Sequence, residues 1–226
     1  MTPAVIAEEL AVAQVRLAAV TDHNSCENVQ AVTAALASRG IACLAGMEVE
    51  TREEVHVLCF LPQLEAAWDW QEWVYRHLPY RPNDERRFGP QIRFTADGQP
   101  AGQVERLLAL SIEASLDEVV AEVKARGGLC IPAHVDRPAY SLLAMLGVIP
   151  EGLDVPALEI SPYAREQEVR QQLGGLGGYR IVSFSDAHHP SGIVPARTTF
   201  YIDSPVLEEI RLALRGEAGR QVVVLD

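Results

Sequence analysis

Residues 115–134 read SLDEVVAEVKARGGLCIPAH and contain one complete helix–strand unit. Ser115, followed three residues later by Glu118, forms a capping-box pattern that predicts the start of a helix. The paired glycines predict its end, because glycine readily adopts the left-handed conformation found after a helix. The apolar run at 129–133 then predicts a buried strand. His134 follows this strand directly, so its imidazole, a side chain that can bind metal ions, is expected at the carboxyl end of the strand.

The same alternation of helix-like and strand-like segments runs along most of the chain. Strands are expected at 17–20, 41–45, 55–61, 129–133, 157–160, 180–184, 198–202 and 221–225. Helices are expected at 3–15, 27–39 and 206–215, after Ser115, and near Ser141 and Glu166. Short apolar strands separated by helices are typical of a parallel sheet covered on both faces. Seven or eight such strands favour a barrel over an open sheet, although 226 residues are slightly fewer than the ~250 typical of a closed α/β barrel.

Residues 62–113 interrupt this rhythm, and we interpret them as an insertion that covers the barrel within a single domain of residues 1–226. A hairpin is expected around Asp97-Gly98. His77 is expected to be structural. The segment also holds the three tryptophans, which we expect to pack against the barrel and not to stack on a nucleobase, and arginines that could contact substrate; these residues are Trp68, Trp70, Trp73, Arg81, Arg86 and Arg87.

The overall charge is acidic, with 31 Asp and Glu residues against 19 Lys and Arg residues, a net charge of −12. Affinity for a nucleic-acid backbone comes from clustered basic residues. We therefore predict no extended nucleic-acid binding. The charge does not exclude a small phosphorylated substrate that binds in a local pocket.

Cysteine usage and hydropathy predict a cytoplasmic protein. The apolar stretches are shorter than the ~18 residues needed to cross a bilayer, and the first residues lack a basic export signal. No C-x-x-C pair occurs, so we expect reduced core cysteines and no membrane association. The four cysteines are Cys26, Cys43, Cys59 and Cys130.

Five of the six histidines lie in a predicted strand or just after one. These are His23, His56, His134, His188 and His189, and the carboxylates Glu48 and Asp186 also follow strands closely. In parallel α/β folds the carboxyl ends of the strands converge on one rim, where active sites are built. Imidazoles and carboxylates gathered there suit zinc, iron or manganese.

Each residue also has an ordinary structural explanation. A lone strand histidine such as His56 is more often a hydrogen-bonded core residue, and Asp22 or Glu50 fits a helix cap or a solvated rim charge. Of the adjacent His188 and His189, only one normally points at a given site. Since ligand-type residues after four different strands are hard to explain separately, the joint pattern predicts a metal site.

Five ordered motifs resemble those of the PHP (polymerase and histidinol phosphatase) superfamily. They are Thr-Asp22-His23, Gly-Met-Glu48, Val-His56-Val-Leu, Pro-Ala-His134 and Ser-Asp186-Ala-His188. The resemblance implies a distorted seven-stranded (β/α) barrel, up to three metals at the carboxyl rim, and hydrolysis of phosphoesters. The metal ligands that it implies are His23, Glu48, His56, His134, Asp186 and His188.

One departure from the family pattern concerns its first motif, an H-x-H on the first strand. This chain begins at the following helix, so we expect a barrel that lacks its first strand. Either the start codon lies further upstream or the motif has been lost. By the family pattern Glu48, His56 and His134 complete one metal position. The resemblance therefore predicts one divalent metal (Zn, Mn or Fe), and up to three where the first motif is present.

The leading functional hypothesis is a metal-dependent phosphoesterase acting on a small phosphorylated metabolite or nucleotide. In the implied mechanism Glu48 bridges two metal positions and Asp186 binds one of them, since paired metals activate water and neutralise phosphoryl charge. Arg137 is a candidate phosphate clamp, because its guanidinium fits two phosphate oxygens, and Arg197 is a weaker one. A structural salt bridge is the alternative for both arginines.

Two other hypotheses belong to different classes. The first is a catalytically degenerate PHP barrel that serves as a regulatory or interaction module with partial metal occupancy. The second is a metal-dependent amidohydrolase, which we rank last. That family commonly uses a carboxylated lysine, and the single lysine of this chain, Lys124, lies in a predicted helix.

Overall fold

The computed structural model describes residues 1–174 and 176–225 and shows a mixed α/β fold. The helices are α1 (Pro3–Val12), α2 (Val29–Ala37), α3 (Leu64–His77), α4 (Glu85–Phe88), α5 (Leu116–Ala125), α6 (Leu142–Leu146), α7 (Glu166–Leu173) and α8 (Leu207–Arg215), with a 3₁₀ turn at Pro190–Gly192. The strands are β1 (Leu17–Val20), β2 (Ala42–Glu50), β3 (His56–Leu61), β4 (Ile92–Phe94), β5 (Pro100–Gln103), β6 (Leu129–Pro132), β7 (Ala157–Ile160), β8 (Arg180–Ser183), β9 (Thr198–Tyr201) and β10 (Gln221–Val224).

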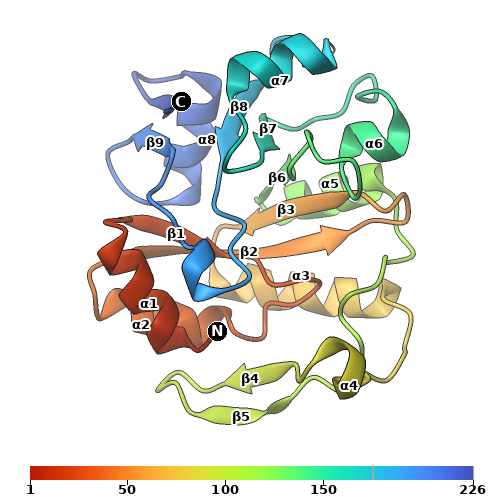
Figure 1. Ribbon diagram of the computed structural model, residues 1–226, viewed down its shortest axis with the longest axis vertical. Coiled ribbons are helices and arrows are strands. Elements are labelled where there is room, and N and C mark those ends of the chain that lie inside the picture. The colour runs from red at the N-terminus through yellow and green to blue at the C-terminus, as the bar shows by residue number, and fades with distance from the viewer. Residues whose placement is uncertain (175, 226) are drawn as a thin grey trace.

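The largest sheet has four strands in the order β1-β2-β3-β6 and crosses the middle of the molecule (Figure 1). Three two-stranded sheets accompany it, namely β7-β8, β9-β10 and β4-β5. In Figure 1 the helices α2 and α3 lie on one side of the four-stranded sheet, and β7, β8 and β9 lie on the other. The described strands form separate sheets and are not closed into a barrel, so the seven-stranded barrel stays a prediction.

Strand direction departs from the fully parallel arrangement that the sequence predicts. The pairs β1-β2 and β7-β8 are parallel as expected, but β3 runs antiparallel to both β2 and β6, and β9-β10 is antiparallel. The reason at β3 is the short connection 51–55, since a parallel crossover needs a dozen or more residues whereas antiparallel neighbours need only a turn. The chain therefore reverses its direction between β2 and β3.

Both faces of the central sheet are buried, each in its own apolar cluster. On β3, Val57, Cys59 and Leu61 belong to the cluster under the helices, whereas Leu58 and Phe60 belong to the cluster toward α8. This division follows from the two-residue periodicity of a strand. The continuous apolar strand pattern is thus explained by burial on both sides.

The segment 62–113 contains one element of the main core and one small hairpin. Trp70 and Trp73 on α3 stack at 4.9 Å between ring centroids and are buried in the helix-side cluster, which confirms packing for these two, while Trp68 is exposed. The hairpin expected at Asp97-Gly98 is confirmed as β4-β5. The boundaries of an insertion stay a prediction.

Further structural points concern the cysteines, the turn that follows α7, and the membrane. All four cysteines are free thiols. Gly174 ends α7 in the left-handed conformation, as a helix-to-strand turn requires, while residue 175 of that turn lies outside the described residues. Within residues 1–174 and 176–225, no helix combines the length and apolarity needed to cross a bilayer.

Candidate metal centre

Four of the six predicted ligands lie together, with three histidines around the buried carboxylate of a glutamate. Glu48 on β2 lies with its carboxylate oxygens 3.5 Å from His23 Nδ1, 3.1 Å from His56 Nδ1 and 3.5 Å from His134 Nε2. The rings of His23 and His134 lie 5.2 and 5.3 Å from that of His56, between centroids. The three imidazoles therefore converge on Glu48 from three different directions.

The sheet brings these side chains together from distant parts of the chain. His23 follows β1 and forms a parallel bridge to Glu48, supported by a hydrogen bond from the Glu48 N–H to the carbonyl of Asp22. His56 begins β3, whose antiparallel register places it opposite Glu50, next to Glu48. His134 follows β6, which pairs with β3. The β2-β3 hairpin thus places the carboxylate of Glu48 and the imidazole of His56 side by side.

The electrostatics of the cluster favour an ionised Glu48. Burial alone would raise the pKa of Glu48, but hydrogen bonds from His134 and His56 and the charge of His23 outweigh burial and hold that pKa well below its usual range. For His56, burial lowers the pKa, but hydrogen bonds to Glu48 and Glu50 raise it to about 9. The metal-free cluster therefore takes up positive charge around a buried anion.

The donor set fits a divalent metal ion. Single donor atoms of His23, Glu48 and His56 all lie within 4.8 Å of one another. His134 is 2% exposed, and its Nδ1 is a buried nitrogen without a hydrogen-bond partner among the described residues. Imidazole nitrogen and carboxylate oxygen are ligands for zinc, iron and manganese. The convergence of one donor atom from each of His23, Glu48 and His56 is the observation that supports this fit.

The remaining predicted site residues form a second group beside the first. Asp186 lies in the loop after β8 and pairs with Arg137 at 2.5 Å between Oδ2 and Nη2. His188 Nδ1 lies 3.6 Å from Asp186 Oδ1, and the His188 ring is 5.9 Å from that of His23. The structure therefore brings Asp186, His188 and Arg137 to the edge of the cluster, with the guanidinium of Arg137 engaged by Asp186.

Three other residues considered from the sequence lie outside the cluster. The guanidinium of Arg197 donates to the backbone carbonyls of Pro162, Ala164 and Leu225, which is a structural arrangement. The ring of His77 lies against that of Trp73 on α3 at a tilt, with 4.0 Å between the ring centroids. His189 is exposed at the start of the 3₁₀ turn.

Two side chains near the cluster were not predicted from the sequence. Tyr140, in the loop after β6, stacks on His56 at 4.9 Å between ring centroids, and its carbonyl accepts the His56 N–H. Glu159 on β7 is 3% exposed, and burial raises its pKa to about 8, despite a hydrogen bond that it accepts from the His134 N–H. The position of Glu159 inside the apolar run 157–160 was the only available signal, because a carboxylate there must be buried.

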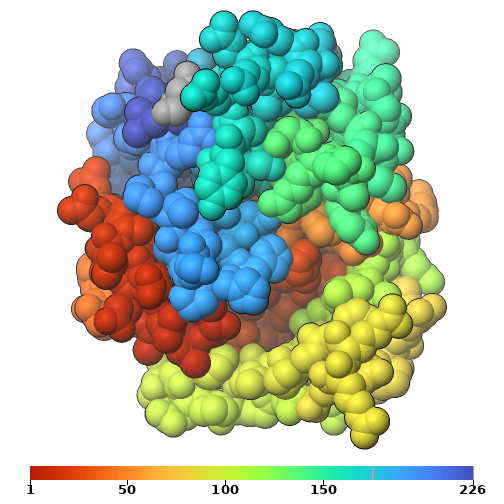
Figure 2. All heavy atoms as spheres, in the orientation of Figure 1, coloured from red at the N-terminus to blue at the C-terminus, as the bar shows by residue number. Residues whose placement is uncertain are grey.

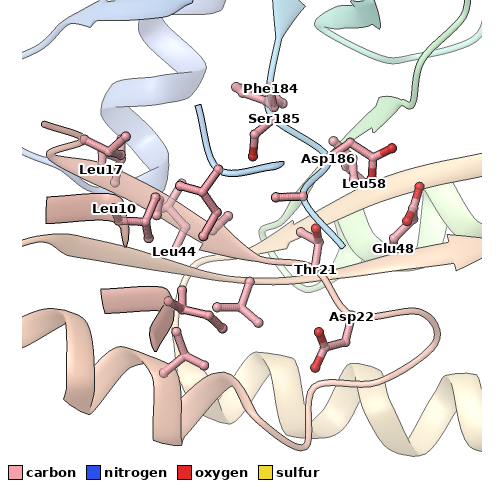
Figure 3. Close-up of a pocket in the computed structure, with 18 of the residues that line it drawn as sticks. Leu10, Leu17, Thr21, Asp22, Leu44, Glu48, Leu58, Phe184, Ser185 and Asp186 are labelled. Carbon is pink, nitrogen blue, oxygen red and sulfur yellow. The ribbon is translucent and has the colours of Figure 1, made fainter. Parts of the chain in front are cut away.

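A cavity of about 1260 Å³ adjoins the cluster. Figure 3 shows its two ends: the carboxylates of Asp22, Glu48 and Asp186 lie toward one side, and Leu17 and Leu44 lie toward the other. On the surface, the segment after β8 covers the centre of the face in Figure 2, and the hairpin region borders a hollow beneath it. A ligand in this cavity can contact both the carboxylates beside the histidine cluster and an apolar wall.

Comparison with protein families and curated proteins gives one relative. No protein-family model matches the chain. Among curated proteins, the uncharacterized YqxK of Bacillus subtilis strain 168 is 24% identical over 195 residues, which cover 82% of this chain and 44% of YqxK.

Three solved structures with PHP-type folds are similar to the chain. The lesion-specific endonuclease PfuEndoQ of Pyrococcus furiosus has a TM-score of 0.62 and 19% identity, covering 98% of this chain and 53% of its own. An amidohydrolase of Chromobacterium violaceum, with bound sulfate and no metal, has a TM-score of 0.56 and 20% identity over 86% of this chain and 85% of its own. A proposed metal-dependent phosphoesterase of Bifidobacterium adolescentis has a TM-score of 0.53 and 18% identity over 96% of this chain and 91% of its own.

These likenesses confirm a PHP-type fold, as the five motifs predicted. At these identities they concern the fold alone. The chain spans about half the length of PfuEndoQ and 44% of YqxK. Activity therefore has to be argued from the site.

The prediction of no extended nucleic-acid binding is wrong. Endonuclease Q in complex with a 27-mer duplex, with an abasic lesion at its active site, shares this fold with a TM-score of 0.59 and 18% identity over 96% of this chain and 52% of its own. The prediction used the net charge of the whole chain, whereas phosphate contacts depend on charges close to the site. Net acidity is not a ground for excluding nucleic acid in this fold.

Proposed function

We propose that this chain carries the active site of a metal-dependent phosphoesterase. The observation that supports the proposal most directly is the convergence of three imidazoles on the buried carboxylate of Glu48, beside a cavity. The likeness to a phosphoesterase and to an endonuclease supports the same class, because both act on phosphoester bonds. The alternative of a degenerate, non-catalytic barrel is not favoured by these findings.

Each site residue has a proposed role. Glu48, His23, His56 and His134 would hold a divalent ion, and Asp186 and His188 would complete a neighbouring position. A bound divalent ion would supply Lewis acidity and an activated water. Glu48 stays ionised near neutral pH because its pKa is held low. Arg137 lies beside Asp186, where its guanidinium can orient a phosphoryl group once it is released from that ion pair.

The finer proposal concerns the substrate, which we take to be a small phosphorylated metabolite or a nucleotide. The cavity supports this choice, because its two chemically different ends can receive a phosphoryl group and the less polar remainder of the molecule. A DNA phosphodiester is the second candidate, and it is supported by the duplex held in the Endonuclease Q complex.

Hydrolysis assays with metal-loaded protein test both substrates. The protein should be loaded separately with Zn²⁺, Mn²⁺ and Fe²⁺, and then given nitrophenyl phosphate, nucleoside monophosphates and an oligonucleotide duplex with an abasic site. We expect metal-dependent phosphate release or strand cleavage that is lost in His134→Ala. The matched control is His189→Ala, because His189 is exposed and lies outside the cluster. Inactivity of all three metal-loaded forms on the whole panel would contradict the proposal.

A further inference from the structure

Glu159 joins the candidate metal centre through the backbone of His134. Its Oε2 accepts the His134 N–H at 3.1 Å, and its backbone carbonyl accepts the N–H of Val135 at 2.8 Å. One residue of β7 therefore holds two successive N–H groups of the loop after β6. Both the donor and the acceptor are nearly inaccessible to solvent, since Glu159 is 3% exposed and His134 is 2% exposed.

The backbone held in this way is in an unusual conformation. His134 has φ of +32°, a region that residues other than glycine rarely adopt. Such a conformation is strained and persists only where the surroundings enforce it. The hydrogen bond from the His134 N–H to the Glu159 carboxyl group is one contact that enforces it. The same turn directs Nε2 of His134 to 3.5 Å from Glu48.

The position of Glu159 in the sheet makes an apolar residue the ordinary choice. Val182 of β8, the strand partner of Glu159, belongs to the apolar cluster toward α8, and so does Ala157. Glu159 projects to the same side as Ala157 because side chains alternate along a strand. A carboxyl group there loses hydration, and burying it without partners is costly. Its hydrogen bond to His134 explains why this position carries an acceptor.

We propose that Glu159 is a positioning residue that sets the His134 imidazole toward Glu48 by accepting the backbone N–H of His134. This inference rests on the metal site of the proposed function. Glu159 acts on the site through the hydrogen-bond acceptor that it places behind the His134 turn, and it is not itself a ligand. Without that acceptor the turn relaxes from positive φ, and the imidazole leaves the position facing Glu48.

Two substitutions at Glu159 separate this role from direct metal ligation. Glu159→Gln keeps an acceptor oxygen at the same place and removes the carboxylate. Glu159→Leu removes the acceptor and places an apolar side chain of similar size in the same position. If Glu159 positions His134, the glutamine variant behaves like the wild type and the leucine variant does not. If Glu159 is a ligand, both variants lose metal.

The first readout is amide hydrogen exchange at His134, measured by NMR on the metal-free protein. We expect slow exchange in the wild type and in Glu159→Gln, and exchange at least ~10-fold faster in Glu159→Leu, because the amide then lacks its acceptor. This readout involves neither a metal nor a substrate. Failure of the proposed phosphoesterase activity therefore cannot be mistaken for failure of this inference.

The second readout is the affinity and visible absorption spectrum of bound Co²⁺, a spectroscopic probe of ligand geometry. Loss of a group that orients a metal ligand typically weakens binding 10–100-fold. We expect a weakening of that size and an altered spectrum in Glu159→Leu, with Glu159→Gln within about threefold of the wild type. Absence of Co²⁺ binding by the wild type would overturn the inference together with the metal site.

Asp136→Ala is the matched control. Asp136 Oδ1 accepts the N–H of Ser161 at 2.8 Å. It thus also links the loop after β6 to the end of β7, but it does not accept the His134 N–H. It should lower stability while leaving the Co²⁺ spectrum and the exchange rate of the His134 amide unchanged. The inference is overturned if Glu159→Leu leaves both readouts at wild-type values, if Glu159→Gln loses Co²⁺ like the leucine variant, or if Asp136→Ala alters both readouts equally.

Discussion

Replacing Glu48 with glutamine tests whether the histidine cluster holds a divalent cation. Glutamine has nearly the same shape but carries no charge, so His23, His56 and His134 keep a neighbour at about the same distance and lose the anion. A metal ion would then face three neutral imidazoles and an amide. We expect metal affinity to fall sharply while the fold is retained.

The size of the effect can be worked out for thermal unfolding. At a metal concentration 100 times the wild-type Kd, binding stabilises the native state by about 2.7 kcal/mol. Each kcal/mol raises the Tm of a chain of this size by roughly 2–4 °C, so the wild-type Tm should rise by roughly 5–11 °C. Losing an outer-shell partner already weakens metal binding 10–100-fold, so losing the central carboxylate should weaken it at least ~100-fold. At the same metal concentration the variant is then stabilised by about 0.4 kcal/mol, and its Tm rises by less than ~2 °C.

The assay is differential scanning calorimetry of the wild type and of Glu48→Gln, each with and without Mn²⁺ or Zn²⁺. Glu72→Gln is the matched control, because Glu72 is an exposed carboxylate on α3. It should keep the full metal-dependent rise in Tm. A Glu48→Gln variant that shows the same rise as the wild type would refute the assignment of Glu48 as a ligand.

Three further predictions concern the framework of the site and are measured by urea or thermal unfolding. Gly128→Ala should destabilise by about 1–3 kcal/mol, since an added Cβ would lie 2.6 Å from the carbonyl oxygen of Phe60; unchanged stability would show that the strand shifts freely. Ser115→Ala should cost about 1 kcal/mol, because the hydroxyl caps α5 by accepting the Glu118 N–H, and Ser115→Asp should restore most of it. Asn24→Ala should cost roughly 1–3 kcal/mol for each carbonyl left unpaired, as the buried amide donates to two of them at 2.8 Å; a loss under ~1 kcal/mol would contradict that role.

Local signals in the sequence predicted the elements well where the residues themselves impose the structure. The capping box at Ser115 is present, with both of its hydrogen bonds, and the strand after it runs from Leu129. The strands at 17–20 and 157–160 have the predicted bounds. These features depend on contacts within a few residues, so they are visible in a single sequence.

Strand direction and supporting contacts were not predictable in the same way. The pairing of β3 with β6, about 70 residues away in the chain, could not be predicted, because periodicity does not encode a strand's partner. Glu159 likewise gains its role only when β7 lies beside the loop that carries His134. The convergence of strand ends in α/β folds predicted that His23, Glu48 and His56 would lie together, whereas no local pattern pointed to Glu159.

The error about nucleic acid shows which charges matter at this site. At physiological ionic strength, exposed charges are screened over about 8 Å, so most of the net charge of −12 does not act on a phosphate in the cavity. The local charges are those of the histidine cluster and Arg137, set against the carboxyl groups of Asp22, Glu48, Glu50 and Asp186. A divalent ion bound to Glu48 would offset part of this negative charge and leave Arg137 available to a phosphoryl oxygen. The affinity of the site for a phosphoester, whether in a nucleotide or in DNA, should therefore follow metal occupancy more closely than the overall charge of the protein.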